Sequence, residues 1–347
     1  MPSNGRSGDE VVSIVVPVFN AERYVRESLT SILSQTYSPL QVIVMDDAST
    51  DGSGEIAADI ARSDDRVQVY RQTKNAGQFA TVNAGLELAR GRFVAVYHAD
   101  DVYHPEIVAR EVAFLREHPS ASAVFTLAVL IDEAGREFGR MRPLPPEIEA
   151  ADLLPYQLVL NALLRHTCTF LASPSALARR EVYAALGGHA LEYGIRSDLD
   201  MWLRIARHGP VGLLRDHLLK YRVGDHNESS RYRQLRTQPD LFFSVIDNRL
   251  ANGDRQLAEP DAMTAYEAHR AADLLIAAGN AYLTRDRARL RELLSMVSVR
   301  RLLASREVQR WRLSLLYVLL HLFLRLPHSR ALSGLLWRRW HTRRATR

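Results

Sequence analysis

Phe93–Asp101 reads FVAVYHADD, a β-branched and aromatic run that ends in two adjacent carboxylates. A similar arrangement occurs earlier, where Leu40–Met45 (LQVIVM) is followed by Asp46 and Asp47. In open α/β sheets ligands bind outside the carboxyl ends of the strands, so we expect both acidic pairs to face one crevice. Two apolar strands that end in paired aspartates indicate a polyanion site with a divalent cation between protein and ligand.

Strands and helices alternate around these two runs. Val11–Val16 is a continuous β-branched run, typical of a strand buried on both faces. Asn20 is a candidate N-cap for the helix that follows it. The pattern continues with helices near 25–33, 53–62, 78–90 and from 105, and strands near 40–45, 67–70, 92–97 and 123–129. Such alternation predicts βαβ units and a mostly parallel sheet flanked by helices.

The chain falls into three segments by composition. Residues 1–10 are polar and have no apolar run, so we expect a disordered leader and no secretory signal. Residues 11–230 hold the alternating α/β pattern, whereas residues 231–347 show helical spacing throughout. We therefore expect an α/β domain followed by an all-helical C-terminal appendage, which the 347 residues can accommodate.

Cysteine content and charge narrow the cellular setting. A single cysteine, Cys168, excludes an internal disulfide and fits a reducing compartment, so we expect a cytoplasmic protein. The formal net charge is +5, with basic residues crowded toward the C-terminus. No nucleic-acid-binding motif accompanies them, so we expect no nucleic acid partner. Anionic lipid is the better partner for this basic end.

The most apolar stretch is Leu313–Leu324, which is shorter than the ~20 residues that span a bilayer. It is flanked by Trp311, Trp337 and Trp340 and by many arginines. One interpretation is an interfacial anchor that holds the protein peripherally on the inner face of the cell membrane. The other is a helix packed against the catalytic domain or a dimer partner.

Asp100 and Asp101 are the sharper of the two acidic pairs. Adjacent acids at the end of a buried strand repel each other and lose solvation unless a cation or hydrogen-bond donors compensate. Mg²⁺ or Mn²⁺ takes few protein carboxylates and is completed by substrate phosphates. The alternative is that this pair caps a helix before Pro105. For the earlier pair, the alternative is that the acids only accept backbone N–H groups in the turn where the strand ends.

Four motifs in this order resemble the family 2 glycosyltransferases of the GT-A (Rossmann-like) fold: SIVVPVFN (13–20), VMDDASTD (44–51), KNAG (74–77) and ADD (99–101). The resemblance covers about residues 11–230 and implies an inverting enzyme that uses a nucleotide-diphosphate sugar. It implies that Asp101 holds the Mg²⁺ or Mn²⁺ on the diphosphate and that Asp47 bonds uracil or thymine. The implied nucleotide-binding residues are Pro17, Phe19, Asn20, Asp47, Lys74, Asn75 and Asp100.

The chain departs from the family pattern at His98, where the family usually has an aspartate. His98 is a bystander, a nucleotide contact or an additional metal ligand. In the segment GIRSDLDMWLR (194–204), the family's Glu-Asp pair appears as Ser197 and Asp198. The resemblance makes Asp198 the catalytic base, and the alternative is a helix cap. Asp200 lies about 200° around the helix, so both acids cannot point into one cleft.

A last motif, YRVGDHNESS (221–230), resembles a family segment that reaches the diphosphate. His226 and Arg222 are candidate diphosphate or metal contacts that would stabilise charge on the leaving group. His226 is displaced from its usual place by an insertion, and Arg222 is alternatively part of a structural ion pair.

The sequence therefore predicts an inverting, metal-assisted glycosyltransferase with a UDP- or dTDP-sugar donor. We expect the acceptor to be a hydroxyl of a polysaccharide or glycolipid of the cell envelope. One alternative is a non-catalytic scaffold that binds sugar nucleotides, because His98 and Ser197 each replace a family acid. The other is a nucleotidyltransferase, although the first strand lacks the glycine-rich basic phosphate loop expected after it.

Overall fold

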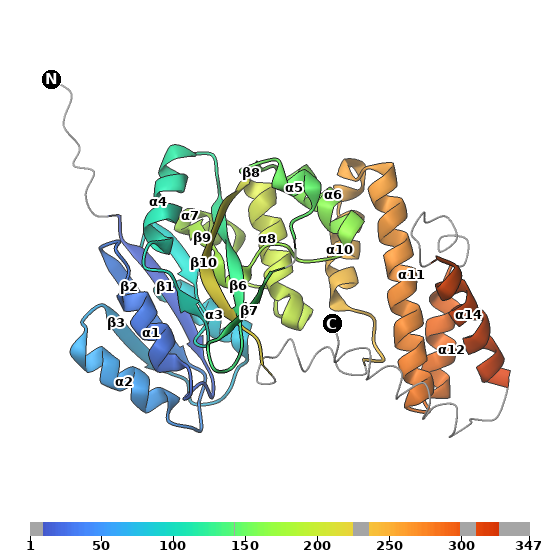
Figure 1. Ribbon diagram of the computed structural model, residues 1–347, viewed down its shortest axis with the longest axis horizontal. Helices are drawn as coiled ribbons and strands as arrows, with labels where there is room; N and C mark the ends of the chain where they lie inside the picture. Colours follow the sequence, from blue (N-terminus) through green and yellow to red (C-terminus); the bar gives the residue numbers. More distant parts are fainter. Residues whose placement is uncertain (1–9, 142, 225–235, 299–309, 326–347) are drawn as a thin grey trace. The chain divides into compact units, whose positions relative to one another are not determined.

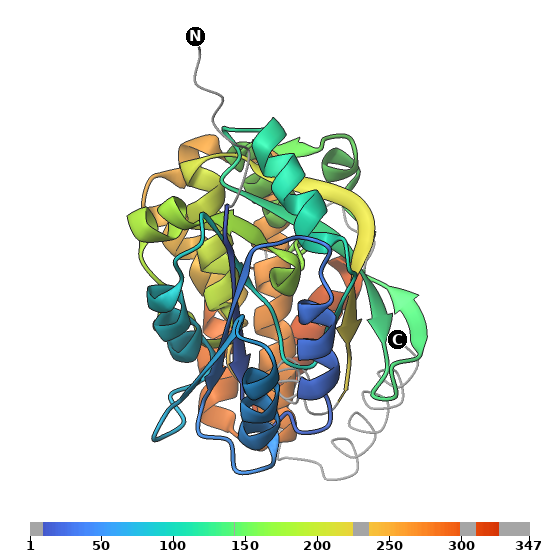
Figure 2. The ribbon, with the colours of Figure 1, turned by 90° about the vertical axis from the view of Figure 1, so that its left-hand side faces the viewer.

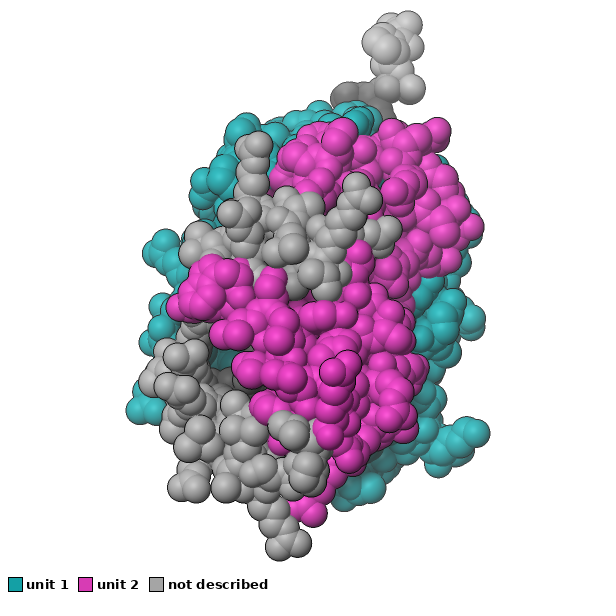
Figure 3. Space-filling view, turned by 90° about the vertical axis from the view of Figure 1, so that its right-hand side faces the viewer, with its two compact units in different colours: residues 1–162, 168–227 teal, residues 163–167, 228–347 magenta. Residues whose placement is uncertain are grey.

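The computed structural model describes residues 10–141, 143–224, 236–298 and 310–325. The chain divides into two compact units, coloured separately in Figure 3. Unit 1 comprises residues 1–162 and 168–227, and unit 2 comprises residues 163–167 and 228–347. The expected disordered leader, up to residue 9, and the basic C-terminal end from residue 326 lie outside the described residues.

Unit 1 is an α/β unit built on one large sheet (Figure 1). Its strands are β1 (Val12–Val18), β2 (Leu40–Asp46), β3 (Val67–Arg71), β4 (Phe93–Val96), β5 (Val102–Tyr103), β6 (Ala123–Ile131), β7 (Glu137–Arg140), β8 (Leu153–Leu154), β9 (Leu177–Arg179) and β10 (Val211–Arg222). Its helices are α1 (Val25–Leu33), α2 (Ser53–Ser63), α3 (Gln78–Leu88), α4 (Ile107–Glu117), α5 (Pro146–Glu149), α7 (Arg180–Leu186) and α8 (Ser197–His208). Helix α6 (Tyr156–His166) begins in unit 1 and ends in unit 2.

The strand order is β3-β2-β1-β4-β9-β6-β10-β5, with β7 beside β6 and β8 beside β10. Strands β3, β2, β1 and β4 are parallel, as the alternating sequence pattern predicted. Strand β9 lies antiparallel between β4 and β6, and the sequence did not indicate it. It is only three residues long, so it carries no readable period.

Helices cover both faces of the parallel strands, as Figure 2 shows for α3 on one side and α1 and α2 on the other. Ile14 and neighbouring alternate residues of β1 share a core cluster with Leu29 of α1. The opposite face of β1 meets α3 closely, because a Cβ built on Gly85 would lie 2.4 Å from Cγ1 of Val15. Burial on both faces explains why β1 and β2 read as continuous apolar runs.

Unit 2 is helical, as predicted for the C-terminal appendage. Its helices are α10 (Leu241–Ala251), α11 (Pro260–Leu283), α12 (Arg287–Met296) and α14 (Arg310–Arg325), with no strand among its described residues. Leu274, Leu293 and Leu320 belong to a core cluster that joins α11, α12 and α14. Among the helices that the structure describes, none has the length and apolarity needed to cross a bilayer.

Candidate active site

The candidate site lies where β1, β2 and β4 end. Val18 pairs with Asp46 across β1 and β2, and the β1–β4 register ends at Val15 opposite Val96. Parallel strands that end in register bring the residues that follow them to one edge of the sheet. The loops after β1, β2 and β4 therefore start side by side, and they carry half of the residues that the motifs singled out.

The two aspartates at the end of β2 have different partners. Asp46 is fully buried, and its carboxylate accepts the N–H of Ser49 at 2.9 Å and lies 3.2 Å from Nε of Arg71. Asp47 accepts the backbone N–H groups of Ala76 and Gly77 at 2.7 and 2.9 Å. These contacts tie the end of β2 to the β3–α3 loop.

That loop carries Lys74 and Asn75, which are both exposed. Gly77 closes the loop with φ of 91°, a conformation that glycine adopts without strain. The carboxylate of Asp47 retains acceptor capacity beyond its two backbone bonds, because two carboxylate oxygens offer about four acceptor positions. Asp47 therefore orders the Lys74–Asn75 loop and retains acceptor positions for a further donor.

The end of β1 and the segment after it hold Pro17, Phe19 and Asn20. Phe19 is 49% exposed, although it is a large aromatic residue directly after a buried strand. Asn20 has φ of 49°, and its side-chain oxygen accepts the N–H of Thr50 at 2.8 Å. The prediction that Asn20 caps the next helix is wrong, because α1 begins only at Val25 and Asn20 bridges to the β2 loop instead.

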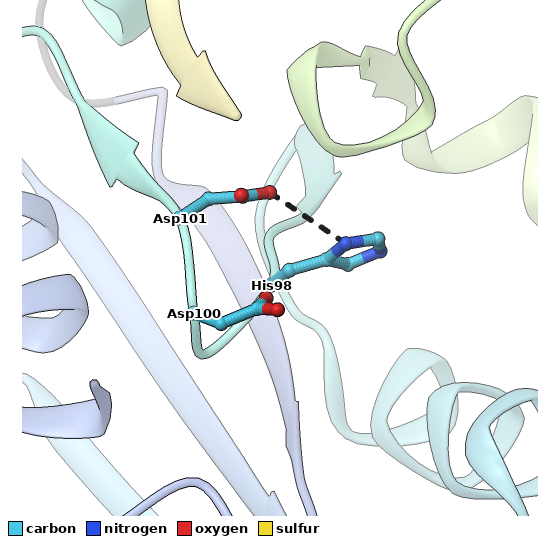
Figure 4. A group of neighbouring side chains, drawn as sticks. All are labelled: His98, Asp100 and Asp101. Atoms are coloured by element: carbon cyan, nitrogen blue, oxygen red, sulfur yellow. Dashed lines mark ion pairs between the residues drawn. The ribbon is translucent and has the colours of Figure 1, made fainter. Parts of the chain in front are cut away.

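His98, Asp100 and Asp101 form a cluster after β4 (Figure 4). One nitrogen or oxygen of each side chain lies within 4.8 Å of the others. Asp101 is 1% exposed, and its Oδ1 accepts the backbone N–H of Arg222 at 2.8 Å. Its Oδ2 lies 3.6 Å from Nδ1 of His98 and has no hydrogen-bond partner among the described residues. A buried carboxylate oxygen thus faces the cluster without a hydrogen bond from these residues.

This cluster fits a divalent cation. Burial raises the pKa of Asp101 well above its usual range, and the negative charge of Asp100 acts in the same direction. A bound Mg²⁺ or Mn²⁺ would supply the missing partner of Oδ2 and compensate the repulsion between the two acids. His98 turns its Nδ1 toward Asp101, and burial lowers its pKa, which favours the neutral imidazole that metals bind.

Asp198 lies in the first turn of α8 and is held by a short chain of hydrogen bonds. Its Oδ2 accepts the hydroxyl proton of Ser173 at 2.7 Å, and Ser173 Oγ accepts the indole N–H of Trp202 at 2.8 Å. Asp198 is near enough to His98 that its charge acts to raise the pKa of that histidine, against the larger effect of burial. Asp200 points elsewhere and pairs with Arg204 at 2.8 Å, in line with its expected position on the helix.

Arg222 is buried, 1% exposed, and makes many contacts. Its guanidinium donates to the carbonyl oxygens of Asp100, Asp132 and Glu133 and pairs with Glu27 at 2.6 Å. These contacts favour the structural ion pair over the diphosphate contact predicted from the motif. His226, the companion of Arg222 in that motif, lies outside the described residues.

Replacement of Arg222 with leucine is expected to lower the free energy of unfolding by at least about 3 kcal/mol, because buried carbonyl groups lose their donor. Arg23→Leu is the matched control. Arg23 and Arg222 both lie over the ring of Tyr24, but the ion pair of Arg23 with Glu133 is exposed. We expect the control to change stability by less than about 1 kcal/mol. Urea denaturation of both variants measures the difference, and similar losses would contradict the structural role of Arg222.

His189 is a buried residue beside the site that the sequence did not indicate. Its ring packs on Phe79 with centroids 5.0 Å apart, and its Nδ1 lies 3.3 Å from the carbonyl oxygen of Ser197. Its Nε2 is buried without a hydrogen-bond partner in the described part of the chain. Burial lowers the pKa of His189 from 6.5 to about 4, so the ring is neutral in the folded protein.

A depressed pKa makes the fold sensitive to acid. Below the unfolded value of 6.5 the unfolded chain takes up a proton that folded His189 excludes, so stability is lost as the pH falls toward 4. His189→Phe keeps the aromatic packing and removes this proton. We expect the wild type to lose about 2 kcal/mol more than the variant between pH 7 and pH 5, measured by urea denaturation. Equal losses would contradict the neutral burial of His189.

Other supporting residues also escaped prediction. Ser173 holds Asp198, Gln78 lies 3.4 Å from the His98 ring, and the hydroxyl of Tyr103 accepts the His98 backbone N–H at 2.6 Å. The sequence carried one usable signal, because Trp202 follows Asp198 by four positions and so shares its helix face. Ser173 and Gln78 come from distant segments that only the tertiary fold brings to the site.

Comparison with known proteins identifies the family. Residues 13–187 match the family described as Glycosyl transferase family 2. EpsE of Bacillus subtilis (strain 168), a glycosyltransferase by name, is 32% identical over 242 residues, which cover 69% of this chain and 79% of EpsE. TuaG of the same organism, named for teichuronic acid biosynthesis, is 27% identical over 221 residues, which cover 63% of this chain and 82% of TuaG. The chain belongs to glycosyl transferase family 2 and is a glycosyltransferase, as its motifs predicted.

Solved structures share the fold. Residues 1–349 of Staphylococcus aureus TarS in complex with UDP-GlcNAc superpose with a TM-score of 0.60 at 18% identity, covering 88% of this chain and 87% of that one. The mannosyltransferase PcManGT from Pyrobaculum calidifontis, in complex with GDP-Man and Mn²⁺, superposes with a TM-score of 0.50 at 20% identity. The match covers 89% of this chain and 84% of PcManGT. These likenesses confirm the predicted GT-A type of α/β fold. The family match ends at residue 187, before Asp198 and Arg222.

Proposed function

We propose that this glycosyltransferase moves a sugar from a UDP- or dTDP-sugar to a hydroxyl of a polysaccharide or glycolipid, with inversion and with a divalent cation. The observation that carries the proposal is the buried Oδ2 of Asp101, which lies beside His98 and Asp100 and has no hydrogen-bond partner in the described part of the chain. A buried carboxylate oxygen without a partner costs stability unless a ligand compensates it. Its place at the carboxyl ends of the strands is where nucleotides bind in related sheets.

The donor nucleotide is proposed to lie along the loops after β1, β2 and β3. Phe19, exposed after β1, offers a ring for stacking on the base, with Pro17 and Asn20 beside it in the chain. Asp47 accepts the uracil or thymine N–H. Lys74 and Asn75 line the nucleotide from the loop that Asp47 orders.

The diphosphate end is proposed to lie at the His98–Asp101 cluster. Asp101 would hold the cation, with His98 as a further ligand, and Asp100 would contact the ribose or the sugar. When bound, Mg²⁺ or Mn²⁺ supplies positive charge that neutralises the diphosphate and stabilises it as the leaving group. The Arg222 backbone N–H fixes Oδ1 of Asp101, so that Oδ2 faces the cluster.

Asp198 is proposed as the general base. It removes the proton of the acceptor hydroxyl as that oxygen bonds to the anomeric carbon and the bond from carbon to the phosphate oxygen breaks. Attack opposite the leaving diphosphate turns an α-linked donor into a β-linked product. Ser173, itself bonded to Trp202, orients the Asp198 carboxylate through the 2.7 Å hydrogen bond.

The names of the similar proteins support the ligand class. TarS was solved with UDP-GlcNAc and with UDP, and PcManGT with GDP-Man and Mn²⁺. TuaG is named for teichuronic acid biosynthesis, which fits the proposed polysaccharide or glycolipid acceptor. Membership in the glycosyltransferase family removes the nucleotidyltransferase alternative and leaves the sugar-nucleotide scaffold as the rival.

Donor cleavage by water tests this function without knowledge of the acceptor. The purified protein is incubated with Mg²⁺ and, in turn, UDP-glucose, UDP-N-acetylglucosamine and dTDP-glucose, and proton NMR follows the anomeric signals. We expect slow, EDTA-sensitive release of nucleoside diphosphate from one of them, with the β-anomer of the free sugar appearing first. The α-anomer appearing first would contradict inversion. No release from any donor would favour the scaffold.

A further inference from the structure

Helix α14 of unit 2 is apolar on two opposite faces. Its inner face carries Leu320, which is buried, and further apolar residues that pack into the core with α11 and α12. Its outer face is defined by five exposed side chains: Trp311 (61% exposed), Leu315 (53%), Val318 (52%), Leu319 (37%) and Leu322 (47%). At 100° per residue these five side chains fall within a stripe of about 100°.

The outer face holds half of the large apolar side chains that are exposed in the described residues. Scattered exposed apolar residues need no explanation, but a contiguous stripe marks an interaction surface. The inner face already packs α14 against α11 and α12. The second apolar stripe therefore serves some other contact.

The charge around this helix identifies the partner. Residues 310–347 contain nine arginines and no aspartate, glutamate or lysine, which gives this segment a formal charge of +9. Because the whole chain carries +5, residues 1–309 carry −4. The segment also holds three of the four tryptophans, Trp311, Trp337 and Trp340. Exposed apolar residues, tryptophan and unopposed arginine together match the boundary between the headgroups and acyl chains of an anionic bilayer.

We propose that the outer face of α14 binds the surface of a membrane that contains anionic lipid, with the helix lying in the plane of the interface. Its apolar stripe enters the acyl boundary, and the exposed Arg312 and Arg325 meet the lipid phosphates. A second copy of the chain is the less favourable partner, because two segments of +9 without carboxylates repel each other across a symmetric interface. A nucleic acid would engage the arginines but leave the apolar stripe in water. This inference is independent of the proposed function.

Vesicle sedimentation tests the proposal with the full-length protein. Vesicles of phosphatidylcholine alone are compared with vesicles of equal parts phosphatidylcholine and phosphatidylglycerol. We expect at least about tenfold stronger partitioning onto the anionic vesicles, weakened by high salt. The triple change Leu315→Ser, Val318→Ser and Leu322→Ser should lower that partitioning by at least about tenfold.

Phe138→Ser is the matched control, because Phe138 is 59% exposed on unit 1 and should leave vesicle binding unchanged. Leu315→Trp is a second test that enlarges the apolar stripe and should strengthen partitioning several-fold, whether or not the triple variant folds. Equal binding to both vesicle types, or wild-type binding by a folded triple variant, would overturn the proposal. So would light scattering that shows a wild-type dimer and a monomeric triple variant.

Discussion

Asp101→Asn is expected to abolish metal-dependent donor binding and to lower turnover by at least about 10³-fold, because several kcal/mol of charge stabilisation at the diphosphate are lost. The same change should make the metal-free protein more stable by about 1–3 kcal/mol. Asparagine keeps an oxygen for the Arg222 N–H and removes the buried charge that repels Asp100. Loss of binding together with a gain in stability is a result that general damage to the fold cannot produce.

Thermal denaturation with and without Mn²⁺ measures both effects. The wild type should melt at a higher temperature with Mn²⁺, because a ligand of the folded state stabilises it. Asp101→Asn should have a higher melting temperature than the wild type without Mn²⁺, and Mn²⁺ should not raise it further. Asp46→Asn is the matched control, since Asp46 is a buried aspartate at the same sheet edge but outside the cluster, and it should keep the shift. An equal Mn²⁺ shift in the Asp101 variant would place the cation elsewhere.

Asp198→Asn is expected to lower kcat by about 10²–10⁴-fold, while the affinity for the donor nucleotide changes by less than about twofold. Asparagine can still accept the Ser173 hydrogen bond, so the change removes the base and little else. Ser173→Ala should lower kcat by about tenfold, because the Asp198 carboxylate stays in place but loses the hydrogen bond that orients it. Steady-state kinetics with the donor identified by NMR, and titration of the free nucleotide, separate these effects.

Asp200→Asn is the comparison on the same helix. Asp200 pairs with Arg204, which in turn donates to the carbonyl oxygens of Leu186 and Gly188, so its loss should affect stability more than kcat. Unchanged turnover in a folded Asp198→Asn protein would remove this residue as the base. A large kcat loss in Asp200→Asn and none in Asp198→Asn would reverse the assignment.

The parallel half of the sheet was predictable because its strands are buried on both faces. Burial on both faces favours nearly continuous apolar runs rich in β-branched residues, and such runs are readable at Leu40–Met45 and Phe93–Val96. That both acid pairs follow strands at one edge of the sheet was predictable from geometry, since parallel strands end at a common edge. Strand β9 was not predictable, because three residues carry no period and its pairing depends on β4 and β6 already being in place.

The supporting contacts of the site were less visible in the sequence than the acids themselves. The Arg222 backbone N–H reaches Asp101, and its side chain reaches Glu27, across long separations in the sequence. His189 reads as an ordinary residue after two glycines, and only its burial against Phe79 makes it neutral. Ser173 lies in a short turn far from Asp198 in the sequence. Such contacts depend on tertiary packing, which local periodicity does not encode.

The central claim, that a nucleotide-diphosphate sugar binds through a cation at Asp101, is tested most directly by calorimetric titration. UDP is titrated into the wild type with Mn²⁺ and again with EDTA, and then into Asp101→Asn with Mn²⁺. We predict binding by the wild type that requires the metal and is lost in the variant. Failure of the wild type to bind UDP, dTDP or GDP under either condition would contradict the claim, as would metal-dependent binding that survives in Asp101→Asn.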